Sequence, residues 1–196
     1  LCGRSFEYYS EDPYLSGKLA AGFIRGAQKQ GVSACAKHYA ANAQELLRMH
    51  SDSVMDERTL REMYLTNFEI AIKEGKPGFV MTAYNRVNGV YANESRHLLG
   101  DILRGEWGFD GAVVTDWGGS NDHALGVKNG STLEMPAPGG DAVRELLKAV
   151  ETGKISKSDV DARLDELLTL IYDTHAAVQN HSRSFDAAAH PALRPR

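Results

Sequence analysis

Short apolar runs alternate with amphipathic helical segments along most of this chain, and this alternation constrains its fold more than any other feature. The runs lie at residues 32–36, 79–83, 112–115 and 132–135. Strands that alternate with helices form a parallel sheet with helical crossovers. Four strands are too few for an eight-stranded barrel, so the pattern predicts either a small open α/β domain or part of a larger barrel.

The helical segments carry start and stop signals. Pro13 suits the first position of a helix over residues 13–30, and Asp56 is expected to cap the next helix, which ends near Gly75. Further helices are predicted at residues 98–107, 121–128, 141–151 and after a capping box at residues 156–159. The apolar stripes of the first and last helices are expected at Leu15, Leu19, Phe23 and Ala27, and at Leu164, Leu168 and Ile171.

Composition and charge limit the classes of partner. The chain has 196 residues, of which 42% are hydrophobic and 24% are charged, and these values are ordinary for a globular protein. A net charge of −4 does not suggest a nucleic-acid partner, and no apolar stretch approaches the roughly 20 residues of a membrane span. Cys2 and Cys35 form neither a disulfide framework nor a zinc pattern, which mildly favours a reducing, cytoplasmic compartment.

Polar side chains follow each apolar run, and the most informative of them is Asp116. This carboxylate ends the run at residues 112–115 and enters the glycine-rich segment 117–119. Because the carboxyl ends of parallel strands meet at one face, it should converge with the polar groups after the other runs. Those groups are Lys37-His38, Tyr84-Asn85-Arg86 and Glu134-Met135.

A carboxylate in this position can attack, coordinate or accept a proton. Positive charge from Lys37 and His38 would hold Asp116 ionised, as a nucleophile requires, or these groups would bind substrate hydroxyls. The alternatives are that Lys37 is a solvated charge and that Trp117 lies in the core instead of stacking on a sugar. No second metal-binding carboxylate pair or phosphate loop accompanies Asp116, so neither a metal nor another cofactor is predicted.

Five ordered motifs resemble glycoside hydrolase family 3. They are GRSFEYYSEDP at residues 3–13, AKHY at 36–39, MTAYNRVNG at 81–89, WGFDG at 107–111 and VTDW at 114–117. The resemblance covers residues 1–179 and implies the N-terminal barrel domain of that family, as an incomplete TIM-type (β/α)8 barrel with roughly its middle and C-terminal portion. It also implies a β-glucosidase-like hydrolase that removes terminal β-linked glucosyl or similar residues with retention.

The resemblance implies roles for individual residues. Asp116 matches the family's catalytic nucleophile, which forms a covalent glycosyl-enzyme. The positions that match substrate-binding residues are Arg4, Lys37, His38, Tyr84, Trp117 and, as pocket lining only, Met135.

Other parts of such an enzyme are the expected partners of this chain. The resemblance implies upstream strands, and a following α/β sandwich domain that supplies the general acid/base glutamate. The segment at residues 40–45 lacks the histidine that serves as acid/base in the N-acetylglucosaminidase branch. The opening residues read like the interior of a protein, and residues 180–196 are predicted to be a linker or disordered tail. An open barrel exposes strand edges, which a homo-oligomer would cover.

Two other functions stay open from the sequence. One is a catalytically incomplete carbohydrate-binding or interaction module, which does not need a nucleophile at Asp116. The other is a glycoside phosphorylase of the same family, in which phosphate replaces water. Glu7, Glu11, Glu45 and Glu134 are acid candidates, but none is convincing, so the chain alone is expected to be weak or inactive on alkyl glucosides.

Overall fold

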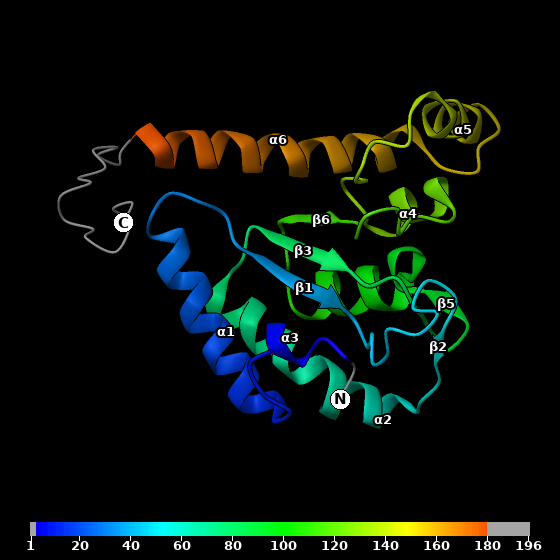
Figure 1. Cartoon of the computed structure of the whole chain (residues 1–196). Helices are drawn as coiled ribbons and strands as arrows, with labels where there is room; N and C mark the ends of the chain where they lie inside the picture. The colour runs from blue at the N-terminus through cyan, green and yellow to red at the C-terminus, as the bar shows by residue number, and fades with distance from the viewer. Residues whose placement is uncertain (1–2, 180–196) are drawn as a thin grey trace, which may run out of the picture.

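A parallel sheet lies at the centre of the computed structural model, which describes residues 3–179 (Figure 1). Within those residues the sheet has the strand order β1-β3-β6, with bounds Cys35–Tyr39, Phe79–Thr82 and Ala112–Val114. A parallel bridge from Val114 to Leu133 extends the sheet beyond β6. The predicted α/β architecture with a parallel sheet is confirmed, although the fourth apolar run contributes only this bridge.

Helices connect the strands and cover the sheet (Figure 1). Helix α1, Pro13–Gln28, precedes β1 and packs against the helical stretch that joins β1 to β3. That stretch consists of α2 Glu57–Thr59, a π-helical turn Leu60–Leu65, α3 Thr66–Ile70 and a second π-helical turn Ala71–Gly75. A π-helical segment, Arg96–Glu106, joins β3 to β6. The helices after β6 are α4 His123–Asn129, α5 Gly140–Glu151 and α6 Lys157–Gln179.

A second, smaller sheet holds the loop that follows β3. Its strand order is β2-β4-β5, with bounds Asp52–Ser53, Arg86–Val87 and Val90–Tyr91. Asn88 and Gly89 both have positive φ, 50° and 87°, as the tight turn between β4 and β5 requires. Short 3₁₀ turns lie at Ser5–Glu7 and Ala92–Glu94.

The helix start signals in the sequence are confirmed by their hydrogen bonds. Asp12, the residue before Pro13, accepts the Tyr14 N–H with its side chain, and the Asp56 side chain accepts the Thr59 N–H at 2.7 Å. Ser156 and Asp159 form a reciprocal capping box, in which each side chain accepts the backbone N–H of the other. Local chemistry therefore fixes where these helices begin.

The main core lies between the sheet and the helices and is built around Tyr39. Its ring contacts Phe68 and Trp107 edge-on, at centroid distances of 5.2 and 5.9 Å, and its hydroxyl donates to the Leu98 carbonyl at 2.9 Å. The buried aliphatic side chains around it include Leu60, Leu65, Ile72, Val80, Leu99, Ile102, Leu103 and Val113. This core supports β1 directly behind the residues that form the site.

Strand β1 lies three residues later in the chain than the sequence pattern predicts. The expected run was 32–36, whereas the strand begins at Cys35, which pairs with Phe79. The register of a parallel strand is set by its partner, and here the partner places Lys37 and His38 inside the strand instead of after it.

The predicted apolar stripes of α1 and α6 are largely exposed. Leu15, Leu19 and Phe23 face solvent, and α1 instead buries a row of small residues and one isoleucine: Ser16, Gly17, Ala21 and Ile24. Gly17 allows close packing, because a Cβ there would lie 2.8 Å from Ile70. In α6, Leu164, Leu168 and Ile171 are exposed as well. Periodicity located the apolar stripes, but these stripes face solvent, and in α1 a different face is the buried one.

Residues 180–196, where the sequence predicts a linker or disordered tail, lie outside the described residues. Among the helices of residues 3–179, none has the length and apolar character needed to cross a membrane. The same residues contain no cluster of three or more His, Cys, Asp or Glu side chains suited to a metal ion.

Candidate active site

The site is centred on a contact between β1 and the segment after β6. His38 Nε2 lies 3.5 Å from Asp116 Oδ2, and the two side chains are only 3% and 14% exposed. His38 comes from the C-terminal half of β1, and Asp116 follows β6 by two residues. The predicted convergence of these two residues is therefore present in the structure.

Asp116 is held in place by its own loop. Its Oδ1 accepts the Trp117 N–H at 2.7 Å, and its backbone carbonyl accepts the Gly119 N–H at 2.8 Å. Gly118 takes a φ of +76°, which allows the chain to turn back in this way. One carboxylate oxygen is thus fixed by the backbone, and the other faces His38.

Tyr84 forms the second support of this loop. Its hydroxyl donates to the Trp117 carbonyl at 2.8 Å. Burial, and then the negative charge of Asp116, raise the pKa of Tyr84, so its hydroxyl stays protonated at neutral pH. Tyr84 therefore places a hydrogen-bond donor and an aromatic face beside Asp116.

His38 is a neutral donor in this site. Burial lowers the pKa of His38 by more than the Asp116 charge raises it, and the charges of Lys37 and Arg4 lower it further. The predicted positive charge beside Asp116 therefore does not come from His38 at neutral pH. The buried Nδ1 of His38 has no hydrogen-bond partner among the described residues.

The lowered pKa of His38 gives a prediction about stability. As the pH falls from about 7.5 to about 5.5, the unfolded chain takes up the proton before the folded chain does, so the free energy of unfolding should fall. His38→Gln should flatten this decline, and His97→Gln, at an exposed histidine, is the control variant. Urea unfolding at several pH values measures the slope, and an unchanged slope in His38→Gln would contradict the neutral assignment.

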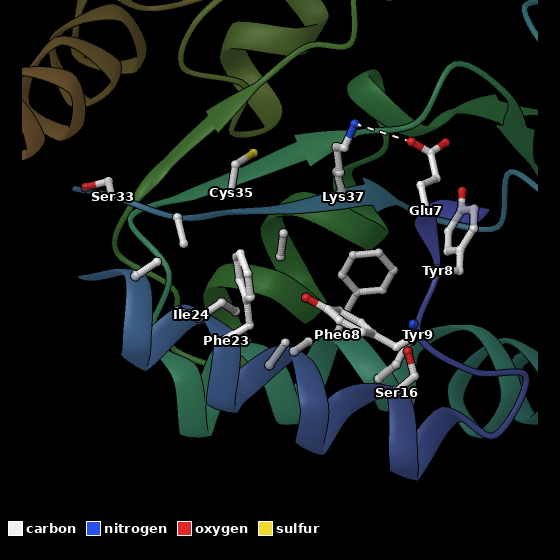
Figure 2. A pocket seen from close by; sticks show the side chains of 16 residues that line it. Glu7, Tyr8, Tyr9, Ser16, Phe23, Ile24, Ser33, Cys35, Lys37 and Phe68 are labelled. Carbon is white, nitrogen blue, oxygen red and sulfur yellow. Dashed lines mark ion pairs between the residues drawn. The ribbon is translucent and has the colours of Figure 1, made fainter. Parts of the chain in front are cut away.

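Arg4 and Lys37 lie near the site but pair with a different carboxylate. Arg4 forms a short ion pair with Glu7, and Lys37 Nζ lies 3.8 Å from Glu7 Oε2. Figure 2 shows Lys37 and Glu7 facing each other above a cavity of about 340 Å³ between β1 and α1. Lys37 also lines a cavity of about 500 Å³ next to His38. Lys37 thus lines both cavities, Arg4 is held by Glu7, and the ion pairs of both cations are with glutamates instead of Asp116.

Arg48 belongs to the site, although the sequence analysis did not identify it. Its guanidinium lies 4.6 Å from the centroid of the Tyr84 ring, and Nη1 pairs with Glu45 at 2.9 Å. Arg48 lies in the connection between β1 and the next helix, where there is no periodicity to reveal it. The only signal was the unusual length of that connection.

Trp117 and Met135 form the edge of the site. The Trp117 side chain is 53% exposed, which excludes the interpretation of a core tryptophan. The Met135 carbonyl accepts the Gly118 N–H at 2.9 Å, and the Met135 N–H donates to Thr115 Oγ1 at 2.9 Å. Met135 is therefore tied to the Asp116 loop through its backbone.

Three of the four acid candidates already have basic partners. Glu7 pairs with Arg4 and Lys37, Glu45 pairs with Arg48, and Glu134 pairs with His123. A carboxyl group engaged in such a pair must first be released before it can protonate a leaving group. The structure thus supplies a candidate nucleophile, but these glutamates do not provide a matching acid.

The comparisons with known proteins agree with this arrangement. A model of the glycosyl hydrolase family 3 N-terminal domain matches residues 2–170. Thermostable beta-glucosidase B of Acetivibrio thermocellus is 47% identical over 195 residues, which cover 98% of this chain and 25% of that protein. An exo-alpha-(1->6)-L-arabinopyranosidase of Bifidobacterium longum is 42% identical over 97% of this chain and 25% of its own length.

The structural comparison confirms the fold class. Beta-glucosidase 3B of Thermotoga neapolitana, solved in complex with glycerol, superposes with a TM-score of 0.89 at 42% identity, over 97% of this chain and 28% of that one. The parallel sheet with helical crossovers is thus part of a (β/α) barrel. The chain spans about a quarter of the length of these relatives. It belongs to glycosyl hydrolase family 3, and residues 2–170 are a part of that family's N-terminal domain.

Proposed function

We propose that this chain carries the nucleophile side of a retaining β-glucosidase-type active site, with Asp116 as the residue that bonds to the anomeric carbon. The observation that carries the proposal is the contact of Asp116 with His38 at the mouth of the parallel sheet. The Trp117 N–H fixes one oxygen of the carboxylate, so the other is presented in a defined direction. Such preorganisation is what a nucleophile in a covalent mechanism needs.

The chemistry follows from the needs of retaining hydrolysis. Asp116 attacks the anomeric carbon while an acid protonates the leaving oxygen, and water then cleaves the glycosyl-enzyme with the same group acting as base. The two carboxyl groups of such enzymes lie roughly 5 Å apart. Because Glu7, Glu45 and Glu134 are each engaged by a basic side chain, we assign the acid/base to a domain that lies outside this chain.

The remaining site residues bind the sugar. Arg4, Lys37 and Arg48 supply charged donors for hydroxyl groups, and His38 supplies a neutral one. Trp117 offers an exposed aromatic face on which the apolar side of a pyranose can stack, and Met135 lines the edge. These features suit a terminal β-linked glucosyl residue or a pyranose of similar shape.

A chimeric enzyme, called the graft below, tests this function. Residues 1–196 replace the matching segment of the Acetivibrio thermocellus beta-glucosidase B, which supplies everything outside that quarter of the protein. We expect the graft to hydrolyse p-nitrophenyl β-glucoside, and a parallel assay with the α-L-arabinopyranoside tests the sugar preference. A folded graft that is inactive on both substrates would contradict the proposal.

The isolated chain provides a second prediction. Since it lacks the acid/base, its kcat/KM on cellobiose should be about 10²–10⁴-fold below that of the graft. A dinitrophenyl glucoside has a better leaving group and needs less protonation. The difference in kcat/KM between the isolated chain and the graft should therefore be smaller on that substrate. Efficient turnover of cellobiose by the isolated chain would show that an acid lies within it.

A further inference from the structure

A cluster of three side chains connects the loop after Asp116 to the segment that carries Met135. His123 Nδ1 lies 2.6 Å from Glu134 Oε2 and 3.1 Å from Ser120 Oγ. An ionised carboxylate can only accept a hydrogen bond, so Nδ1 must carry the proton and donate it to Glu134. The tautomer of His123 is thereby fixed by its partner, and Ser120 Oγ can only accept a share of the same N–H.

The cluster is more than a surface ion pair. The side chains of His123 and Glu134 are 19% and 22% exposed, so solvent screens their charge-assisted hydrogen bond only in part. Two other groups face the imidazole. One is the Ser120 hydroxyl, and the other is the carboxylate of Glu145 on α5, which lies 3.9 Å from Nε2. Asp122, the residue before His123, caps α4 and pairs with Lys154.

Two separate connections therefore hold the loop that contains Trp117. The first is the backbone hydrogen bond from the Gly118 N–H to the Met135 carbonyl. The second runs from Ser120 through His123 to Glu134, the residue that precedes Met135. Trp117 lies just before these two connections, and about half of its surface is exposed.

We propose that His123 and Glu134 are positioning residues that hold the Trp117 platform in its sugar-binding orientation. They do so from behind the site, through Ser120 and through the backbone of Met135. The inference rests on the proposed function, because the platform matters only if a sugar binds at Asp116. The positional part of the inference can nevertheless be tested without any activity.

Acrylamide quenching of tryptophan fluorescence in the chain tests the positional part. The two tryptophans are Trp107, which is buried, and Trp117, so quenching reports mainly on Trp117. His123→Leu should raise the quenching constant, and Glu134→Leu should do the same. His123→Asn places an amide N–H donor at a position that corresponds to Nδ1 and should give the wild-type value. His97→Leu removes an exposed histidine–glutamate pair elsewhere and is the matched control.

Two results would overturn the positional part. One is an unchanged quenching constant in His123→Leu and Glu134→Leu when the circular dichroism spectra remain native. The other is a His123→Asn variant that behaves like His123→Leu, because the hydrogen bond would then be irrelevant. If His123→Leu does not fold, the comparison of Glu134→Leu and His123→Asn with wild type decides the question.

Kinetics of the graft test the link to sugar binding. Loss of one charge-assisted hydrogen bond should raise KM by about tenfold in His123→Leu, with kcat nearly unchanged, because a stacking platform contributes uniform binding. His123→Asn should recover most of this loss. A fall in kcat with constant KM would contradict the assigned role. An inactive wild-type graft would instead refute the proposed function and leave the quenching result standing.

Discussion

Asp116→Asn is expected to lower kcat/KM of the graft by at least about a thousandfold, because an amide cannot form the glycosyl-enzyme bond and nucleophile deletions are among the most severe active-site changes. Asparagine has nearly the same shape as aspartate, and its side-chain oxygen can still accept the Trp117 N–H. The loop and its contact with Tyr84 should therefore persist. A large loss of rate in a folded variant would thus report the chemistry and not the structure.

Covalent trapping gives the sharper measurement. A 2-fluoro glucoside with a good leaving group should add one fluoroglucosyl unit to the wild-type graft, and peptide mapping should place it on Asp116. The Asp116→Asn variant should take up no label. Asp173→Asn, at an exposed aspartate on α6, is the matched control and should label and turn over like the wild type. Labelling of another residue, or unchanged turnover in Asp116→Asn, would refute the assignment.

Local signals in the sequence predicted the parts of the fold that depend on neighbouring residues. Pro13 and Asp56 placed helix starts, and Asn88-Gly89 placed the β4–β5 turn, because capping and positive φ are decided within a few residues. The residues at the end of β6 predicted where Asp116 would emerge. These features need no information from distant parts of the chain.

The parts that sequence reasoning missed depend on partners far away in the chain. The position of β1 is set by its pairing with β3, some forty residues later, and not by its own apolar run. The exposed face of α1 has the periodicity of a buried one, since periodicity carries no information about which element covers it. The pairing of Arg4 and Lys37 with Glu7, and the position of Arg48 over Tyr84, likewise arise only from folding.

The active site likewise has features that the sequence predicted and features that it did not. The sequence could predict that Asp116 and His38 converge, because parallel strands end at one face. It could not predict that burial keeps His38 neutral, since the surroundings of an imidazole are set by the whole fold. The His123–Glu134 connection was hidden for a related reason: Glu134 belongs to an apolar run and gave no sign of its partner on α4.

Arg104→Ala is expected to lower the free energy of unfolding by about 3 kcal/mol, the low end of the range for breaking one side of a buried ion pair, because Arg163 still pairs with Glu166. Arg104 Nη2 pairs with Glu166 at 2.9 Å and donates to the Gly130 carbonyl at 2.9 Å, while Nη1 reaches the Gly111 carbonyl at 3.3 Å. Burial lowers the pKa of Arg104 to about 10, so the guanidinium stays charged at neutral pH. Its removal leaves the Gly130 and Gly111 carbonyls without this donor, and leaves Glu166 with Arg163 as its remaining cation in a largely buried region.

The position of this network explains why the effect should be large. Glu166 lies on α6, and its Oε2 also accepts the Thr132 hydroxyl at 2.6 Å, so Arg104 and Glu166 tie α6 to the segment beside β6. Because the apolar face of α6 is largely exposed, the helix depends more than usual on this polar anchor. Arg104→Lys keeps the charge but loses the planar guanidinium. Its free energy of unfolding should therefore lie between those of the wild type and Arg104→Ala.

Urea unfolding of the chain and its variants measures the difference. Arg96→Ala is the matched control, since Arg96 lies on the same helical segment, is 79% exposed in its side chain and pairs only loosely with Asp101, at 3.4 Å. An ion pair that is so exposed should contribute no more than about 1 kcal/mol to the free energy of unfolding. If Arg104→Ala and Arg96→Ala cost the same, α6 is held by its scattered apolar contacts and the buried network is energetically neutral. A clear gap between the two variants would instead identify Arg104 as the residue that joins the last helix to the part of the barrel that carries Asp116.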